Sequence, residues 1–358
     1  MAELHSIPSA LRKELRDELK AAGVFERDAG RAWRKWALLL TSALTATAAS
    51  IALLRAVALP TLVVAPVLAL AAVLWTAFAM TGHEGAHKSM ASSSRHNSAM
   101  LHLTFPLICG LGAHHWKWKH NLLHHLHPNV PGQDFDLQMW PMASHAQDYA
   151  AASPLRQRFI RHGQMWAFWP LTALLPVAMR LNSWRILLRT ARKDGLDRGW
   201  WLDAGCLLGH LTLWLALPSL VVGFGAALGF YLALWSMVGV CLSLVFAPAH
   251  VGMPIQQTHP DDWLGQLQTT RNLRMPRWLS YLFIGLDYQV EHHLFPGVSQ
   301  FQLPKAAAIT RAWAARHGLP YHEIDYGAGI VDVTRYLGRA WREPTLDVGG
   351  AAAAKAAA

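Results

Sequence analysis

The chain has 358 residues, of which 53% are hydrophobic and only 15% are charged, and it contains 17 Trp. Soluble domains carry about 25% charged residues, so this composition argues against an ordinary soluble protein. The net charge of +10 does not indicate nucleic-acid binding either, because the basic residues gather beside apolar segments. Lys and Arg in such positions mark the cytoplasmic side of a membrane.

Residues 1–35 are predicted to form a cytosolic N-terminal amphipathic segment, in which Pro8-Ser9 precedes a helix rich in Leu, Lys and Glu. The start of the chain lacks the basic-then-apolar pattern of a signal peptide, so we expect it to stay in the cytosol. Between Trp36 and Met80 the only charged residue is Arg55. This run is too long for one span of about 20 residues, and Pro60 favours a turn within it.

We therefore predict an all-α integral membrane protein with four transmembrane helices in two hairpins. The spans are placed at 36–59, 61–80, 202–222 and 226–247, with cytosolic portions at 81–200 and 249–343 that form a helical cap. Basic groups precede the first and third spans, so both hairpins should enter from the cytosol and return to it. Residues 36–343 form one membrane domain, and 344–358 are predicted to be a disordered Ala/Gly tail.

The apolar stretch Trp166–Leu181 fits a helix lying in the membrane interface better than a further span, because it contains two Trp and two Pro. If this stretch crossed the membrane as a single additional span, the basic group at 185–198 would lie on the outer side of the membrane, against the preference of Lys and Arg for the cytoplasmic side. The expected location is an inner membrane, as in bacteria, with both termini cytosolic.

Three histidine clusters stand at the edges of the apolar segments: His83-Glu-Gly-Ala-His87, His120-Asn-Leu-Leu-His124-His125 and Gln289-Val-Glu-His292-His293. Residues four apart share one face of a helix, and neutral imidazole is the commonest protein ligand for transition metals. His250 directly follows the fourth span. The predicted topology brings eight histidines and the Gln289 amide to one membrane face, which is enough for two metal ions.

A rival interpretation starts from His83-Glu84-Gly85-Ala86-His87, which is literally the HExxH motif of zinc proteases. A catalytic zinc needs three protein ligands and an open position, so most of the other cluster histidines would stay unexplained. Glu84-x-x-His87 also matches half of a carboxylate di-iron motif, but a second ExxH is missing from the sequence. A metal-binding transport or sensor protein is a third alternative.

The sequence resembles the membrane fatty acid desaturase family from about Arg31 to Gly338. The three boxes look like the HxxxH, HxxxHH and QxxHH boxes of that family, and the third is similar to its acyl-lipid and front-end branch. Segments around the boxes match as well: Trp116–His125, Pro128-Asn129, Gly132–Asp136, Gln268–Asn272 and Asp287–Pro296.

The resemblance implies iron ligands at seven box histidines, with His250 as the family's extra ligand. The full implied set is His83, His87, His120, His124, His125, His250, His292 and His293. Gln289 stands where other branches carry His, so it is a candidate ligand or a neighbour of the ligands. Asp134, Asp136 and Glu291 are interpreted as hydrogen-bond acceptors around the ligands.

The expected reaction is desaturation of a fatty acyl chain with two irons, O2 and two electrons. A lipid hydroxylase on the same scaffold is the nearest enzymatic alternative, and the zinc protease is more remote. The substrate would be a fatty acyl lipid or an acyl thioester held by the bilayer. Front-end relatives often carry a fused haem domain with an HPGG motif, which this sequence lacks, so we expect a separate donor such as ferredoxin with its reductase.

Overall fold

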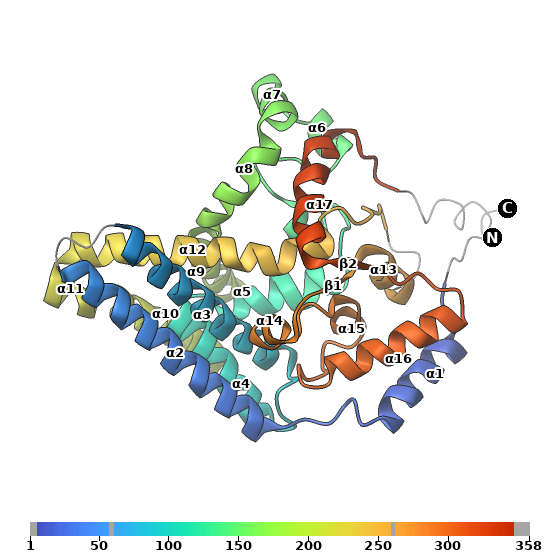
Figure 1. Cartoon of the computed structure of the whole chain (residues 1–358), viewed down its shortest axis with the longest axis horizontal. Helices are drawn as coiled ribbons and strands as arrows, with labels where there is room; N and C mark the ends of the chain where they lie inside the picture. Colours follow the sequence, from blue (N-terminus) through green and yellow to red (C-terminus); the bar gives the residue numbers. More distant parts are fainter. Residues whose placement is uncertain (1–5, 57–60, 259–261, 347–358) are drawn as a thin grey trace. The chain divides into compact units, whose positions relative to one another are not determined.

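The computed structural model describes residues 6–56, 61–258 and 262–346, and Figure 1 shows the whole chain. The chain divides into two compact units. The first unit combines Met1–Glu26, Trp118–Phe168 and Leu244–Ala358, and the second combines Arg27–Lys117 and Trp169–Ser243. The turn predicted at Pro60 and the tail after residue 346 lie outside the described residues.

The described residues contain four helical segments that are long and apolar enough to cross a membrane: Ala29–Arg55, Val63–His87, Arg198–Val222 and Phe224–His250. They correspond to the four predicted spans, but each helix continues past its apolar run. α3 (Thr61–His87) extends through the first histidine box and ends where Lys88 adopts a positive φ of 56°. The first box therefore lies on the membrane helix itself.

The other long helices show the same extension. α2 (Ala29–Arg55) begins seven residues before the predicted span, with Asp28 accepting a hydrogen bond from the Arg31 N–H at its N-terminus. α12 (Phe224–His250) ends on His250. The third candidate span is less regular, because it consists of α10 (Arg198–Leu211), the π-helix η5 (Thr212–Ala216) and α11 (Leu217–Val222).

Within the second unit, α2 and α3 pack side by side (Figure 1). The fully buried Trp75 of α3 donates a hydrogen bond from Nε1 to Thr47 Oγ1 of α2 at 2.8 Å. The same ring lies 5.2 Å from the ring of Trp214 and 6.3 Å from that of Trp235. Trp75 thus connects the first pair of long helices to the second pair.

Gly85 in the first histidine box lets a neighbouring backbone approach α3. A Cβ atom at this position would lie 2.7 Å from the Leu101 nitrogen and 2.8 Å from the Asn97 oxygen, which is too close for any side chain. Both atoms belong to α4 (Ser94–His102), which continues into the π-helix η1 (Leu103–Cys109). The HExxH spacing of the first box therefore contains a glycine that helix packing requires.

Elsewhere in the second unit, the short helix α5 (Ala113–Trp116) is anchored by a buried carboxylate. Asp203 of α10 accepts hydrogen bonds from the backbone nitrogens of Ala113 and His114 at 2.9 and 3.0 Å. The ring nitrogen Nδ1 of His114 lies 2.9 Å from the same carboxylate. Asp203 therefore ties the start of α5 to a membrane-length helix.

The apolar stretch Trp166–Leu181 forms broken helices instead of the single interface helix predicted from sequence. α8 (Gln164–Leu171) contains Pro170, a 3-10 turn follows at η4 (Thr172–Leu174), and α9 (Leu175–Asp194) has Pro176 in its first turn. Because proline lacks a backbone donor and its ring clashes with the preceding turn, two prolines six residues apart divide the segment.

The first unit consists of shorter elements around a buried apolar core. Its further helices are α1 (Ser9–Ala21), η2 (Lys117–His124), η3 (Phe135–Leu137), α6 (Ala146–Ala150), α7 (Pro154–His162), α13 (Asp262–Thr269), α14 (Arg277–Leu282), α15 (Gln289–Leu294), α16 (Leu303–Arg316), α17 (Tyr326–Arg339) and η6 (Ala340–Arg342). Two three-residue strands, β1 (Asn272–Arg274) and β2 (Glu323–Asp325), pair in parallel. They are a local exception to the predicted all-α fold.

The core of the first unit fixes α15, which carries the third histidine box. Leu15 and Leu19 of α1 are fully buried together with Val290 of α15 and Trp313 of α16, and Leu294 of α15 is nearly so. Burying such side chains contributes about 1.5–3 kcal/mol each. The segment predicted to be amphipathic therefore packs as α1 against the helix that follows the third box (Figure 1).

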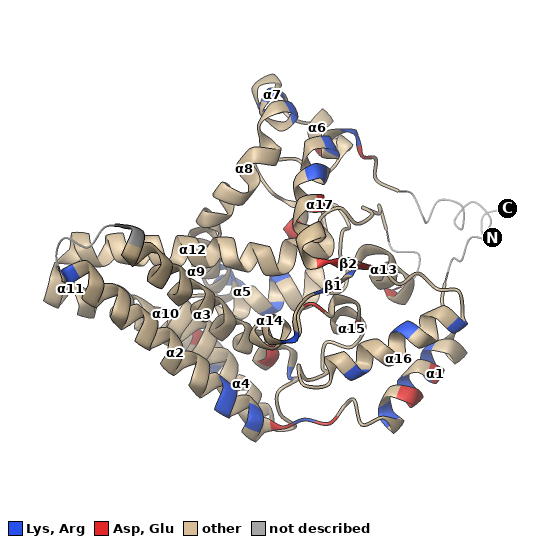
Figure 2. Ribbon diagram, viewed as in Figure 1, with Lys and Arg blue, Asp and Glu red and all other residues tan. Residues whose placement is uncertain are grey.

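The charges follow the division between apolar helices and the rest of the chain. α12 contains no Lys, Arg, Asp or Glu and is drawn in tan throughout in Figure 2. α2 carries Arg31, Arg34 and Lys35 near its start and Arg55 at its end. This distribution is typical of helices that cross a bilayer.

Candidate metal centre

The second histidine box lies on a π-helix, which the spacing of the box does not predict. In η2 the backbone N–H groups bond five residues back, as between the His125 nitrogen and the His120 oxygen at 3.0 Å. This wider turn lets residues four and five apart share one face. The rings of His120, His124 and His125 consequently lie together, with centroids 4.6–5.8 Å apart.

Three further histidines reach the same place from two distant parts of the chain. His250 is the last residue of α12, and His292 and His293 lie on α15. The ring of His250 is 4.8 Å from those of His124 and His293. The His292 ring is 4.7 Å from that of His125.

Six imidazoles thus form one cluster in the first unit. Neighbouring ring centroids are as close as 4.4 Å, between His125 and His293. The ring nitrogens form two sets, and within each set they lie within 4.8 Å of one another. One set is His120, His125 and His292, and the other is His124, His250 and His293.

The nitrogen positions fit metal coordination. His120 Nε2 and His125 Nε2 are 3.1 Å apart, and two nitrogens each about 2.1 Å from one ion at about 90–110° would be about 3.0–3.4 Å apart. The Nδ1 atom of His250 is buried without a hydrogen-bond partner among the described residues. Imidazole donors suit iron, zinc, copper and nickel, so the set suits a transition metal.

Asp134 orients the ring of His124. Its Oδ2 lies 3.1 Å from His124 Nδ1 and accepts the Asn129 N–H at 2.9 Å, while its Oδ1 accepts the Asp136 N–H. A neutral His124 that donates from Nδ1 presents Nε2 as its free donor atom. Asp134 therefore accepts a hydrogen bond at the edge of the histidine cluster.

The charges beside His124 balance one another. Burial lowers the pKa of His124, but the carboxylates of Asp134 and Asp136 outweigh it, and the net pKa is raised. Lys119 Nζ lies 2.5 Å from Asp136 Oδ1. Burial alone would raise the pKa of Asp136. The positive charge of Lys119, and then that of His124, has the larger effect, so the pKa of Asp136 is lowered and the carboxylate stays ionised.

Gln266 of α13 performs the corresponding role for the third box, and sequence reasoning missed it. Its Oε1 accepts a hydrogen bond from His293 Nδ1 at 2.8 Å, and its amide donates to the His125 carbonyl oxygen at 2.5 Å. One buried side chain therefore links boxes two and three. The only signal in the sequence was its place two residues before the motif Gln268–Asn272.

Residues of that motif hold the backbone around His250. Arg271 donates from its guanidinium to the carbonyl oxygens of Pro248 at 2.6 Å and Val251 at 3.1 Å, and its NH1 group pairs with Asp332 at 2.6 Å. Asn129 Nδ2 donates to the His250 carbonyl oxygen at 3.1 Å. The end of α12 is therefore fixed from two sides.

Glu291 is fully buried and bonds away from the ring nitrogens. Its oxygens accept hydrogen bonds from Asn272 Nδ2 at 2.8 Å and the Tyr321 hydroxyl at 2.9 Å. Burial raises the pKa of Glu291 to about 7, against the lowering effect of these two hydrogen bonds. Asn272 also accepts the Val290 N–H at 2.9 Å, so this group fixes α15 to β1.

Gln289 is buried next to the cluster, with its amide nitrogen bonded to the Leu286 carbonyl oxygen at 2.8 Å. This hydrogen bond ties the Gln289 side chain to the segment that precedes α15.

The first box belongs to the second unit. His83 and His87 occupy the last two turns of α3 with ring centroids 4.5 Å apart, and His83 is buried. Glu84 is buried as well and interacts electrostatically with the buried Lys35 of α2. The Glu of HExxH is therefore engaged with a lysine, and the zinc-protease interpretation leaves the six-histidine cluster without a role.

His210, an ionisable residue within the third candidate span, is hydrogen-bonded as a neutral side chain would be. Its Nε2 lies 2.8 Å from the Tyr231 hydroxyl, and its Nδ1 lies 2.9 Å from the Ile108 carbonyl oxygen. These partners are in neighbouring elements of the second unit. His210 therefore has a structural role that joins η1 and α12.

Comparison with known proteins decides the family. A sequence profile described as fatty acid desaturase matches residues 58–325, well over half of the chain. The chain belongs to the fatty acid desaturase family. The sequence resemblance noted above is confirmed by this match, and the four apolar helices are those of a membrane protein of this family.

Curated relatives are 26–28% identical to this desaturase family member. The acyl-lipid (9-3)-desaturase of Borago officinalis is 28% identical over 71% of this chain and 58% of the relative. The Delta(5) fatty acid desaturase fat-4 of Caenorhabditis elegans is 28% identical over 72% of this chain and 59% of the relative. The sn-1 linoleoyl-lipid 6-desaturase of Synechocystis sp. is 26% identical over 72% of this chain and 74% of the relative. The chain thus spans less than two thirds of the first two.

Proposed function

We propose that the protein is an O2-dependent desaturase that introduces a double bond into a fatty acyl chain. The observation that carries this proposal is the cluster of six histidines, drawn from three distant segments and held in two sets of nitrogens. Membership of the desaturase family supports the same reaction. A protease with a single zinc would need only three protein ligands, so it would leave most of the cluster histidines without a role.

We propose two irons, held by His120, His125 and His292 on one side and by His124, His250 and His293 on the other. His83 and His87 would complete the first set, a proposal that rests on the HxxxH spacing and the family pattern of the first box. When bound, iron supplies the one-electron chemistry with O2 that an unactivated C–H bond requires.

The residues around the cluster would keep each imidazole in one orientation. Asp134 accepts from His124 Nδ1 and Gln266 accepts from His293 Nδ1, so these rings keep their Nε2 atoms for metal. Gln289, whose amide nitrogen is bonded to the Leu286 carbonyl oxygen, would support the third box beside the ligands and not bind metal itself. Outer partners of this kind typically change metal affinity or activity by about 10–100-fold.

The proposed substrate is a fatty acyl chain carried on a membrane lipid. The names of the Borago and Synechocystis relatives specify acyl-lipid and linoleoyl-lipid substrates, which favours a lipid over an acyl thioester. These names differ in the position of the double bond, so the position is a matter for product analysis. An alcohol in place of the double bond would identify a hydroxylase.

Electrons would come from a carrier such as ferredoxin with its reductase. The chain has a net charge of +10, and a basic surface steers an acidic partner toward it. With the carrier below saturation, turnover should fall as salt rises and the Debye length drops below about 10 Å. Turnover independent of salt would contradict this steering.

The decisive experiment combines metal analysis with lipid profiling. The purified full chain should contain close to two irons, and cells that express it should accumulate an acyl chain with one additional double bond. A single zinc without iron would support the protease, and two irons without a change in lipids would contradict the desaturase.

A further inference from the structure

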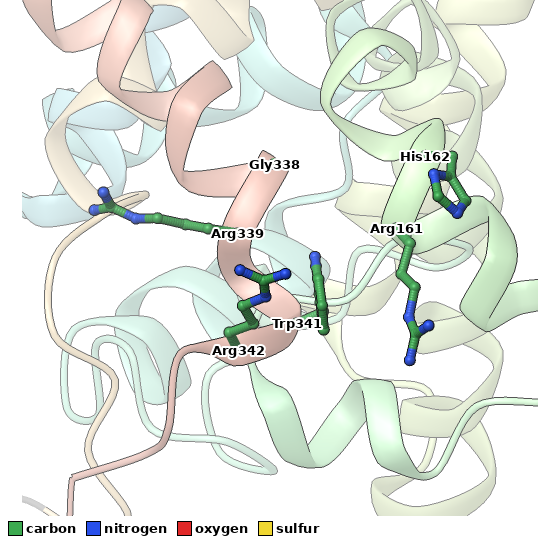
Figure 3. A pocket seen from close by; sticks show the side chains of 6 residues that line it. All are labelled: Arg161, His162, Gly338, Arg339, Trp341 and Arg342. Atoms are coloured by element: carbon green, nitrogen blue, oxygen red, sulfur yellow. The ribbon is translucent and has the colours of Figure 1, made fainter.

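The first unit contains a cavity of about 420 Å³ that is lined by none of the cluster histidines. Its walls come from the end of α7, the end of α17 and the short helix η6, as Figure 3 shows. The lining residues are Arg161, His162, Gly338, Arg339, Trp341 and Arg342. Three arginines and a histidine thus surround one cavity without an acidic lining residue.

Two of the arginines are held against the same aromatic ring. The guanidinium carbon of Arg161 lies 5.0 Å from the centre of the Trp341 ring, and that of Arg342 lies 4.1 Å from it. In Figure 3 Trp341 stands between the two. Stacking on an aromatic face leaves the N–H edges of a guanidinium free to donate hydrogen bonds.

The cavity has an excess of positive charge. Arg339 pairs with Glu343 at 3.0 Å, whereas neither Arg161 nor Arg342 has a carboxylate partner within the described parts of the chain. Guanidinium groups bind phosphate oxygens through paired hydrogen bonds, which are stronger than neutral ones. The chemistry of the cavity therefore fits a phosphate group.

The surroundings of the cavity favour a lipid as the source of that phosphate. Leu155, in the first turn of α7, is 80% exposed, and Trp166, four residues after His162 on α8, is 70% exposed. Exposed Trp near basic residues is typical of the membrane interface, and clusters of Arg and Lys beside a membrane recognise anionic headgroups.

We propose that this cavity binds the phosphate of an anionic phospholipid at the membrane interface, with Arg161 and Arg342 as its main donors. The site is distinct from the histidine cluster, and its occupancy requires neither metal nor turnover. A result that contradicts this lipid-binding proposal would therefore not contradict the proposed desaturation.

The test measures lipid retention on the purified full chain in detergent by native mass spectrometry. Phosphatidylglycerol should bind the wild-type chain more strongly than phosphatidylcholine. The double variant Arg161→Gln with Arg342→Gln should bind phosphatidylglycerol about tenfold more weakly or worse, because it loses charge-assisted contacts. The matched control is Arg158→Gln with Arg335→Gln, which changes the same charge on exposed positions of α7 and α17 and should bind like wild type.

Four outcomes would overturn the proposal. Equal losses in the two double variants would show general charge attraction, and equal binding of the two lipids by wild type would remove the preference for anionic headgroups. Displacement of the lipid by equimolar inorganic phosphate would identify a soluble phosphate ligand. If the double variant bound lipid like wild type but was reduced more slowly by ferredoxin, the cavity would belong to a protein-docking surface. If the double variant lost its helical circular dichroism, the single Arg342→Gln variant and the lipid comparison on wild type would decide.

Discussion

At the scale of single residues, the rings of the cluster are oriented by groups of different chemistry. His124 is oriented by a carboxylate and His293 by an amide, while the backbone of His250 is held by Asn129. A ring whose second nitrogen is bonded cannot rotate without losing that bond, so its donor atom stays in place when metal is absent. These contacts would hold the rings in place before an ion binds to the proposed centre.

Replacement of His124, His250 or His293 by Ala should each abolish turnover and lower the iron content, because each removes a nitrogen from the second set. Membrane insertion should persist, since the apolar helices determine it. Iron analysis and product analysis on membranes would measure both. His96→Ala, at an exposed position on α4, is the control and should behave like wild type, and an active His250→Ala enzyme would exclude His250 as a ligand.

Gln266→Leu should weaken iron retention about 10–100-fold, because it leaves the His293 Nδ1 proton without an acceptor and frees the His125 carbonyl oxygen. Competition with a chelator measures this directly. Gln268→Leu makes the same chemical change two residues later on α13, where the side chain bonds Gln256 instead. Equal iron loss in the two variants would mean that Gln266 supports folding and does not specifically orient His293.

At the scale of elements, the centre depends on how helices end. α12 stops on His250, and Arg271 holds the carbonyl oxygens of Pro248 and Val251 on either side of it. A helix end leaves carbonyl groups without partners in its own helix, and here a single buried guanidinium satisfies two of them. The position of His250 is therefore determined by a residue 21 positions later in the chain.

Arg271→Gln should lower the free energy of unfolding by about 2–4 kcal/mol, since it removes hydrogen bonds to two carbonyls and the Asp332 partner. The loss should appear as a lower thermal midpoint in detergent together with weaker iron binding. Arg274→Gln removes the exposed pair with Asp325 and should change the midpoint little. A stable Arg271→Gln protein with full iron would show that α12 ends correctly without the clamp.

The sequence predicted those features that local patterns encode. The four apolar runs and the three boxes could be located because hydrophobicity and histidine spacing are properties of short segments, and His250 was found from its place after a span. The π-turn at His120–His125, the break of the 166–181 segment and the role of Gln266 depend on tertiary packing. For Gln266 in particular, the partner histidine lies 27 residues away, beyond the reach of any local pattern.

At the scale of the whole molecule, the placement of basic residues predicts topology. Arg185, Arg189 and Arg192 lie on α9, before the third apolar helix, and should face the cytosol. Cysteines introduced near Arg192 should stay unlabelled by an impermeant reagent added to intact cells, whereas those near Gly223 should be labelled. Labelling near Arg192 from outside would show that the 166–181 segment crosses the membrane.

The unbroken course of α12 has a mechanical consequence. Its 27 residues make a rod about 40 Å long, whereas the hydrocarbon layer is about 30 Å thick. Such a rod adapts to a thicker or thinner bilayer mainly by tilting, and its tip is His250. A change in bilayer thickness would therefore change the tilt of α12 and shift His250, one ligand of the proposed centre. The acyl-chain length of the surrounding lipid would in this way affect the geometry of that centre.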